Sequence, residues 1–265
     1  MFRGFRSKPD FRAVRAPARA RWPVLLDPRR DGPAMTTLAV IQHTESEYLG
    51  LIEDHFEGRN IRFRYFRPFA HGGTLPMMPG GFDGLILLGG GPYGVVSGSI
   101  LPSLGPELRL TREFLAEGRP VLGIGLGAVI LAAAAGGGAE EAPLRIAVDM
   151  VEPEPGTWLA EIGRFPLVSY LRDAPFLPEE ARVLARSGDG TVLAFETGPE
   201  AAVRAVGFLG HPGAKRGMAE DLAMEFAETP EGLLEGLTAL GAAQGEIAEV
   251  LGPLVTGLVA RLRWM

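Results

Sequence analysis

Short apolar runs alternate with helical segments along the first half of this chain, and this alternation constrains its fold more than any other feature. Strands are predicted at 38–41, 61–66, 85–88 and 121–124, and helices at 44–55, 106–116 and 128–135. The first helix is expected to open at Thr44, because Glu47 follows it at the spacing of a capping box. Strands alternating with helices predict a doubly wound, mostly parallel α/β sheet with helices on both faces.

The second half of the chain contains shorter extended runs, which we expect to complete the same domain, 35–228. These runs are 146–151, 183–185, 192–195 and 205–209. Between Pro230 and Met265, aliphatic residues recur three or four positions apart, which predicts an amphipathic C-terminal extension, 229–265, of one helix or a helix pair. This extension either packs on its own domain or forms a surface for a partner or a second copy. Charged residues interrupt it before the roughly 20 apolar residues that a membrane span needs.

The first 34 residues differ from the rest of the chain in charge. They hold nine Lys or Arg and three Asp, whereas the whole chain has a net charge of -6. Their prolines and their lack of an apolar period predict a disordered tail, 1–34. It is either an arm for nucleic acid or an acidic partner, or the product of a translation start upstream of Met35. The acidic remainder argues against nucleic acid as the main partner, and the absence of an export signal predicts a cytoplasmic protein.

Three glycine-rich segments follow predicted strands, at the edge where open α/β sheets bind ligands. The first, Gly89 to Gly91, can present backbone N–H groups to an anion. The second, Gly123 to Gly127, is a strand-to-helix turn of the shape that raises a nucleophile on a sharp elbow. The third, Gly207 to Gly213, places His211 near that elbow.

Together these motifs resemble those of the class I glutamine amidotransferase family. The segments that carry the resemblance are Leu87 to Pro92, Gly118 to Gly127, Gly136-Gly137 and Val206 to Pro212, and it covers Leu38 to about Lys215. The resemblance implies a flavodoxin-like fold. It also implies glutamine hydrolysis by a Cys-His-Glu triad, with the ammonia passed to a synthetase.

The chain departs from this family at the residues of the triad. It contains no cysteine, and Gly125 stands at the nucleophile position. Val129 replaces a glutamine of the elbow motif, and Gly213 replaces the glutamate that follows His-Pro. Only His211 remains, and without a thiol no thioester can form. We therefore expect a pseudoenzyme without glutaminase activity, which acts as a noncatalytic binding, regulatory or scaffolding subunit.

The old crevice is expected to persist as a binding site. Its predicted lining residues are Gly89, Gly90, Gly91, Tyr93, Leu126, Val129, His43 and Gly213. The alternative is an enzyme of another class, a hydrolase or transferase of an amide or amino-acid-like substrate, with His211, Tyr93 or His43 as acid or base. Other hydroxyl candidates are Ser97, Ser99, Thr111, Ser169 and Tyr170, none of which is on the elbow.

Three kinds of partner follow from this interpretation. The resemblance implies a biosynthetic or synthetase protein, and the alternatives are a homo-oligomer through 229–265 and a small amide or amino-acid ligand. We predict no cofactor, and no group of histidines or carboxylates has the spacing of a metal site. Restoring Gly125→Cys and Gly213→Glu is expected to return weak glutaminase activity if the glycine-loop N–H groups still form an oxyanion hole.

Overall fold

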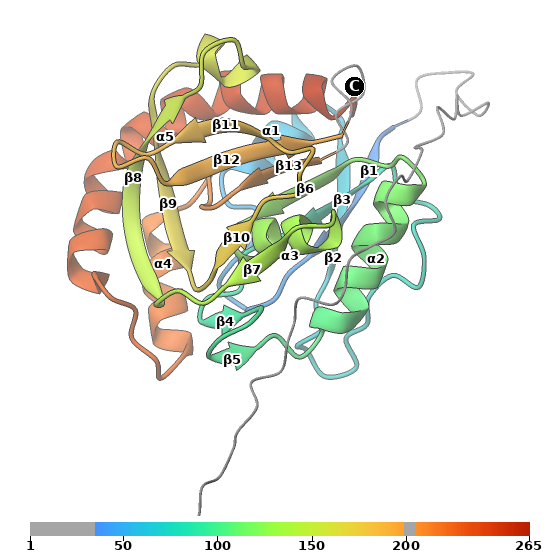
Figure 1. Cartoon of the computed structure of the whole chain (residues 1–265), viewed down its shortest axis with the longest axis horizontal. Helices are drawn as coiled ribbons and strands as arrows, with labels where there is room; N and C mark the ends of the chain where they lie inside the picture. The colour runs from blue at the N-terminus through green and yellow to red at the C-terminus, as the bar shows by residue number, and fades with distance from the viewer. Residues whose placement is uncertain (1–34, 199–204) are drawn as a thin grey trace, which may run out of the picture.

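The computed structural model describes residues 35–198 and 205–265 (Figure 1). The predicted tail, 1–34, lies outside the described residues. A nine-stranded sheet forms the centre, in the order β2-β1-β3-β6-β13-β12-β11-β8-β9. Its strands are β1 (Thr37–Ile41), β2 (Arg62–Phe66), β3 (Gly84–Leu87), β6 (Val121–Ile124), β8 (Arg145–Pro153), β9 (Phe165–Leu171), β11 (Arg182–Arg186), β12 (Val192–Thr197) and β13 (Ala205–Phe208).

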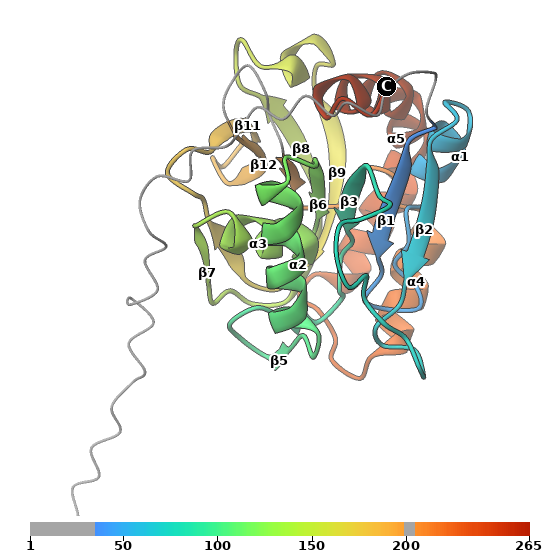
Figure 2. The same cartoon turned by 90° about the vertical axis from the view of Figure 1, so that its right-hand side faces the viewer.

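Helices cover both faces of this sheet. They are α1 (Ile52–Glu57), α2 (Leu104–Ala116), α3 (Leu126–Ala134), α4 (Arg216–Glu225) and α5 (Leu233–Arg261). Figure 2 shows α2 and α3 on one side of the sheet and α1, α4 and α5 on the other. Two short pairs lie outside the sheet, β4 (Tyr93–Gly94) with β5 (Ser99–Ile100) and β7 (Gly138–Glu140) with β10 (Ala174–Phe176).

The sheet has a parallel half and an antiparallel half. Strands β2, β1, β3, β6 and β13 run parallel to one another, and β12, β11, β8 and β9 continue the sheet with antiparallel pairs. Every residue of β3 and β6 is buried. Strands that are covered by helices on both faces read as continuous apolar runs, which is why the sequence revealed them. The predicted doubly wound α/β fold is confirmed.

The predicted helix at 44–55 is wrong, because α1 begins only at Ile52. Thr44 Oγ1 does accept the Glu47 N–H (3.2 Å), as a capping residue would. The Glu47 carboxyl, however, turns toward the glycine loop instead of returning to Thr44. Gly50 then adopts a φ of +63°, which ends any helical path before α1.

The C-terminal segment forms one helix, α5, with Pro253 inside it. Leu251, Leu254 and Leu258 share a buried apolar cluster with residues of β1 and β3. Beyond the helix, the Trp264 ring packs edge-on against Phe56, with 5.9 Å between ring centroids. One face of the predicted extension is therefore part of the core of the α/β fold, because α5 covers the sheet beside α1 and α4.

Candidate functional site

Gly125 lies at the turn between β6 and α3 and has the geometry of a nucleophile elbow. Its φ of 55° and ψ of −121° are angles that residues with a side chain rarely adopt. Its N–H donates to the Phe208 carbonyl (2.8 Å), which fixes the turn to the end of β13. The elbow shape is therefore present, but glycine presents no reactive atom at its tip.

The glycine loop after β3 packs directly against this elbow. A Cβ atom on Gly125 would lie 3.3 Å from the Gly89 Cα. A Cβ on Gly90 would overlap the Leu126 side chain at the start of α3. Glycines are needed in this loop because the two backbones approach so closely.

The Glu47 side chain fills the space beside the elbow. It is 6% exposed, and its Oε2 accepts the Gly91 N–H (3.3 Å). A Cβ on Gly125 would lie 3.9 Å from Glu47 Oε1, and a Cβ on Gly89 would overlap the carboxyl group itself. A carboxyl group of the chain thus lies in van der Waals contact with the position that the Cβ of a nucleophile on the elbow would take.

Burial raises the pKa of Glu47 to about 7. The Gly91 N–H and nearby His43 lower this pKa, while the Glu225 carboxylate raises it, so burial outweighs the hydrogen bond. Glu225, on α4, also holds the loop that carries Glu47. It accepts the Glu45 N–H (2.9 Å), the Ser46 N–H (3.1 Å) and the Ser46 hydroxyl (2.8 Å).

His211 lies at the end of β13, but backbone groups use both of its ring nitrogens. Nε2 donates to the Tyr48 carbonyl (2.7 Å), and Nδ1 accepts the Gly213 N–H (3.1 Å). Burial lowers the pKa of His211 to about 4, so the ring is neutral at pH 7. A neutral histidine with no free nitrogen is placed for a structural role and not for general-base catalysis.

The segment 48–52 closes the crevice on the side of Gly213. The Leu51 N–H donates to the Gly213 carbonyl (3.0 Å). A Cβ on Gly213 would lie 2.8 Å from Ile52 Cγ1 and 3.2 Å from the Ile52 backbone nitrogen. Position 213 therefore has no room for a side chain.

His43 lies behind the glycine loop and not beside the elbow. Its Nδ1 donates to the Gly89 carbonyl (2.9 Å), and its Nε2 pairs with Glu107 Oε2 (2.8 Å). Both side chains are completely buried. Burial lowers the pKa of His43, but Glu107 and the Gly89 carbonyl together raise it above its usual value. An acceptor on each nitrogen favours the charged form of the ring.

The remaining predicted crevice residues separate into two groups. Leu126 and Val129, on α3, are completely buried in the apolar core and offer no polar group to a ligand. Tyr93 is half-buried at the start of β4, where its ring packs edge-on against Phe226 (5.6 Å between centroids). With His43 it lines a separate cavity on the outer side of the glycine loop.

Most of the other hydroxyl candidates are already engaged. Ser97 donates to Asp173, Thr111 to the Glu107 carbonyl, and Ser169 to the Ala147 carbonyl. Ser99 is exposed on β5. Tyr170 is buried, and its hydroxyl has no hydrogen-bond partner among the described residues.

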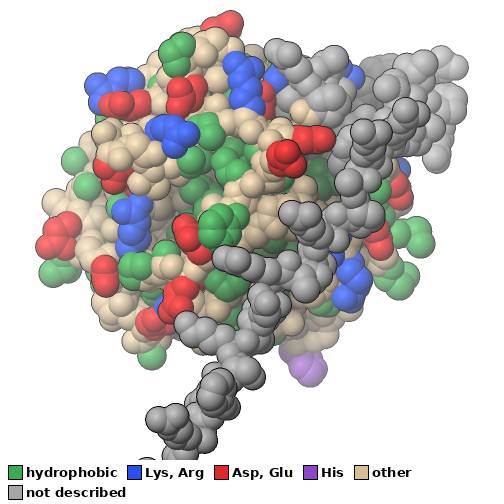
Figure 3. All heavy atoms as spheres, viewed as in Figure 1, with side chains coloured by type: hydrophobic (Ala, Val, Ile, Leu, Met, Phe, Trp, Pro, Cys, Tyr) green, Lys and Arg blue, Asp and Glu red, His purple; other side chains and the backbone are tan. Residues whose placement is uncertain are grey.

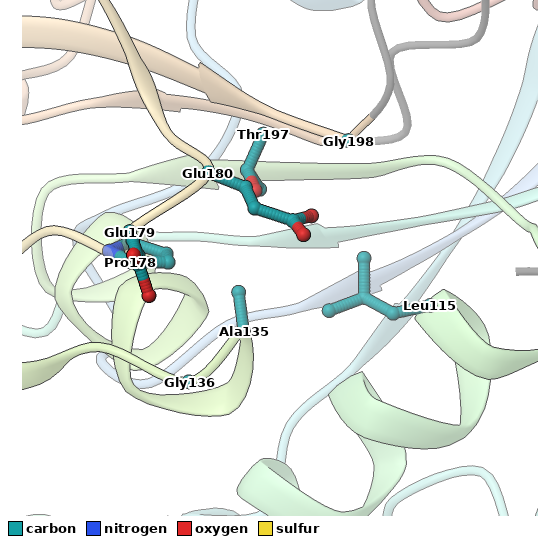
Figure 4. Close-up of a pocket in the computed structure, with 8 residues that line it drawn as sticks. All are labelled: Leu115, Ala135, Gly136, Pro178, Glu179, Glu180, Thr197 and Gly198. Carbon is teal, nitrogen blue, oxygen red and sulfur yellow. The ribbon is translucent and has the colours of Figure 1, made fainter. Parts of the chain in front are cut away.

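A further cavity, of about 180 Å³, lies away from all the predicted site residues (Figure 4). In Figure 4 the Glu180 carboxylate points into the open space in front of Leu115. The residues that line the cavity are Leu115, Ala135, Gly136, Pro178, Glu179, Glu180, Thr197 and Gly198. Leu115 precedes β6, and Gly198 follows β12, which runs antiparallel to the parallel strands. Both residues therefore lie at the amino ends of the parallel strands, and the cavity is at the edge of the sheet opposite to the elbow.

Two further findings apply to the parts of the chain that the structure describes. Within 35–198 and 205–265, no three or more His, Asp or Glu residues are grouped to hold a metal ion. No described helix combines the length and the apolar character that crossing a membrane requires. On the face drawn in Figure 3, basic and acidic side chains are interspersed.

Sequence reasoning missed the two carboxylates of the site. The sequence pattern predicts a helix cap for Glu47, although this residue follows β1 at the same sheet edge as the glycine loop. Glu107 is in the first turn of α2, where an acidic residue normally interacts with the helix terminus. The signal for Glu47 was its position after β1. The contacts of Glu47 with Gly91 and of Glu107 with His43 form only in the three-dimensional fold.

Comparisons with known proteins support the fold. No protein-family model and no curated protein sequence matches the chain. A solved glutamine amidotransferase from Thermotoga maritima superposes with a TM-score of 0.71 at 24% identity, covering 86% of this chain and 99% of that one. A glutamine amidotransferase from Methylobacillus flagellatus gives 0.70 at 21% identity, covering 86% and 96%. The chain therefore has the fold of solved glutamine amidotransferases, as its motifs predicted.

Proposed function

We propose that this chain is a noncatalytic protein on an amidotransferase fold, and that it acts as a binding, regulatory or scaffolding subunit. The observation that carries the proposal is the elbow without a nucleophile. Gly125 supplies no reactive atom, and the Glu47 carboxyl lies beside it. The Gly91 N–H, which could stabilise an oxyanion, is directed to Glu47 instead.

The condition of His211 supports the same proposal. An enzyme rebuilt around His211 would need a free ring nitrogen that can accept a proton. Tyr48 and Gly213 use both nitrogens, and the low pKa of the ring opposes its protonation. The geometry thus favours binding over the alternative of acid–base chemistry at His211.

The purified protein is expected to release no ammonia from glutamine above the rate of a blank reaction. The loss of a single triad member already costs on the order of 10⁴ in rate or more, and here both the nucleophile and the carboxylate are missing. An enzyme-coupled ammonia assay measures this, with His211→Ala as the matched variant. Ammonia release that His211→Ala abolishes would overturn the proposal.

The partner of such a subunit is expected to be a biosynthetic or synthetase protein. Purification of the tagged chain from its native host, with mass spectrometry and native mass measurement, tests this expectation. A synthetase at fixed stoichiometry would support a regulatory or scaffolding subunit. A homo-oligomer alone would contradict a synthetase partner and would direct attention to a small ligand and to the exposed face of α5.

A further inference from the structure

A cavity lies at the point where the direction of strand order changes in the sheet. The chain passes from β1 to β2 on one side and then to β3 on the other side of β1. In open α/β sheets, ligands bind outside the carboxyl ends of the two strands at such a point. His43 follows β1 and Tyr93 follows β3, and both line a cavity of about 190 Å³. The elbow follows β6, so this cavity is a separate site.

Apolar side chains form most of the cavity wall. They come from the segment after β2 and from the residues before α2, and they are Pro68, Phe69, Leu101 and Pro102. An enclosed apolar cavity of roughly 150 Å³ can hold a benzene molecule, and this cavity is of similar volume but partly open to solvent. The cavity therefore has the size and the lining for a single aromatic ring.

Two of the lining residues, Tyr93 and Ser103, carry a hydroxyl group. Ser103 is the N-cap residue of α2 and makes no side-chain cap bond. The Tyr93 ring packs edge-on against Phe226. A hydroxyl group both donates and accepts hydrogen bonds, so the pair suits a group that does the same.

The charge around the cavity is balanced. His43 is the one lining residue with an ionisable imidazole, and Glu107 pairs with it at 2.8 Å. The other Glu107 oxygen, Oε1, is buried without a hydrogen-bond partner in the described part of the chain. The wall thus offers no unpaired charge to an ionic ligand, and the N-terminus of α2 at Ser103 disfavours a cation.

We propose that this cavity binds a small, uncharged aromatic carboxamide, with the ring against Phe69 and Leu101 and the carboxamide at the Tyr93 and Ser103 hydroxyls. The proposal adds a ligand site to the proposed binding role. It does not depend on the state of the elbow, and the ammonia assay tests that state separately. Because His43 also holds the Gly89 carbonyl, the site contacts the glycine loop from its outer side.

Benzamide is the probe for this proposal, with benzylamine as the cationic comparison. In a ¹⁵N-labelled sample of the full chain, benzamide is expected to shift the amide resonances of Tyr93 and Ser103, with a Kd on the order of 1 mM or tighter. Phe69→Ala and Tyr93→Phe should each weaken binding by about fivefold, because they remove a ring contact and a hydroxyl group. Met77→Ala is the matched control, since Met77 is 94% exposed and outside the cavity.

Phe69 is 38% exposed, so its truncation leaves the buried core intact and the folded spectrum can be verified directly. Three results would overturn the proposal. They are no shift at Tyr93 and Ser103 at saturating benzamide, wild-type affinity for benzamide in both Phe69→Ala and Tyr93→Phe, and binding of benzylamine as tight as that of benzamide. None of these results alters the expectation for glutamine hydrolysis.

Discussion

The double variant Gly125→Cys, Gly213→Glu is expected to release no ammonia from glutamine and to lose about 3 to 5 kcal/mol of unfolding free energy. Most of this loss arises at Gly213. A Cβ there would lie 2.8 Å from Ile52 Cγ1 and 3.4 Å from the Leu49 carbonyl oxygen. The rest of the glutamate side chain would have to displace the 48–52 segment, and its charge would be buried without a cationic partner.

The thiol at position 125 would meet a second obstacle. A Cβ there lies 3.9 Å from Glu47 Oε1, so the carboxyl group would be a direct neighbour of the new side chain. A nearby carboxylate also disfavours the thiolate form that a nucleophile requires. The φ of +55° adds strain of order 1 to 3 kcal/mol for a residue with a side chain.

Urea unfolding and the ammonia assay together test this variant. Gly217→Glu is the matched control, because a Cβ on this exposed residue of α4 would meet no atom within 4 Å. The control should change the unfolding free energy by less than about 0.5 kcal/mol. A stable double variant that hydrolyses glutamine would show that the crevice is only disarmed. The expected failure means that residues 47–52 have also reshaped it, against the weak recovery that the motifs alone predicted.

The sequence predicted those features that a short segment determines. Leu85 to Leu88 and Val121 to Ile124 are apolar because helices cover both faces of β3 and β6, so they are recognisable without knowledge of their neighbours. The elbow was predictable because Gly125 is required by a local backbone turn. By contrast, α4 was missed. Glu220 and Asp221 separate its buried residues Met218 and Ala219 from Leu222, and its position depends on contacts with α5.

The interior of the site could not be predicted because it depends on contacts between distant segments. Thr44 and Glu47 satisfy the local pattern of a helix cap, and the cap bond to the Glu47 N–H does form. The Glu47 side chain nevertheless follows a tertiary contact with Gly91, 44 residues away. Tertiary contacts override local propensity, and here they decide whether the crevice is open or filled.

Glu47→Gln is expected to stabilise the protein by about 3 kcal/mol at pH 8 and by much less at pH 5. The usual pKa of this group is 4.5, and burial raises it to about 7 in the folded protein. Between these two values the unfolded chain releases the proton that the folded chain retains. Rising pH therefore favours unfolding through this window, and the penalty is complete above about pH 7.

Glutamine has the shape of a protonated glutamate, and its carbonyl can still accept the Gly91 N–H. The variant should therefore match the wild type below about pH 4.5 and exceed it above pH 7. Other groups near Glu47 also titrate. The pKa of His211 is lowered, so His211 opposes folding as the pH falls toward 4. His43 has a raised pKa and contributes stability that is lost at higher pH.

The difference between variant and wild type isolates Glu47, because the other groups are present in both proteins. Urea unfolding at pH 5 and at pH 8 measures this difference, and Glu45→Gln is the control on an exposed neighbour. A pH-independent difference, or a variant less stable than the wild type at pH 8, would contradict a buried Glu47 with a raised pKa. If the difference grows with pH as expected, the carboxyl beside the elbow is held in the fold at a cost in stability. The surrounding fold then places the Glu47 carboxyl beside the elbow, and no ion pair of Glu47 stabilises the folded protein.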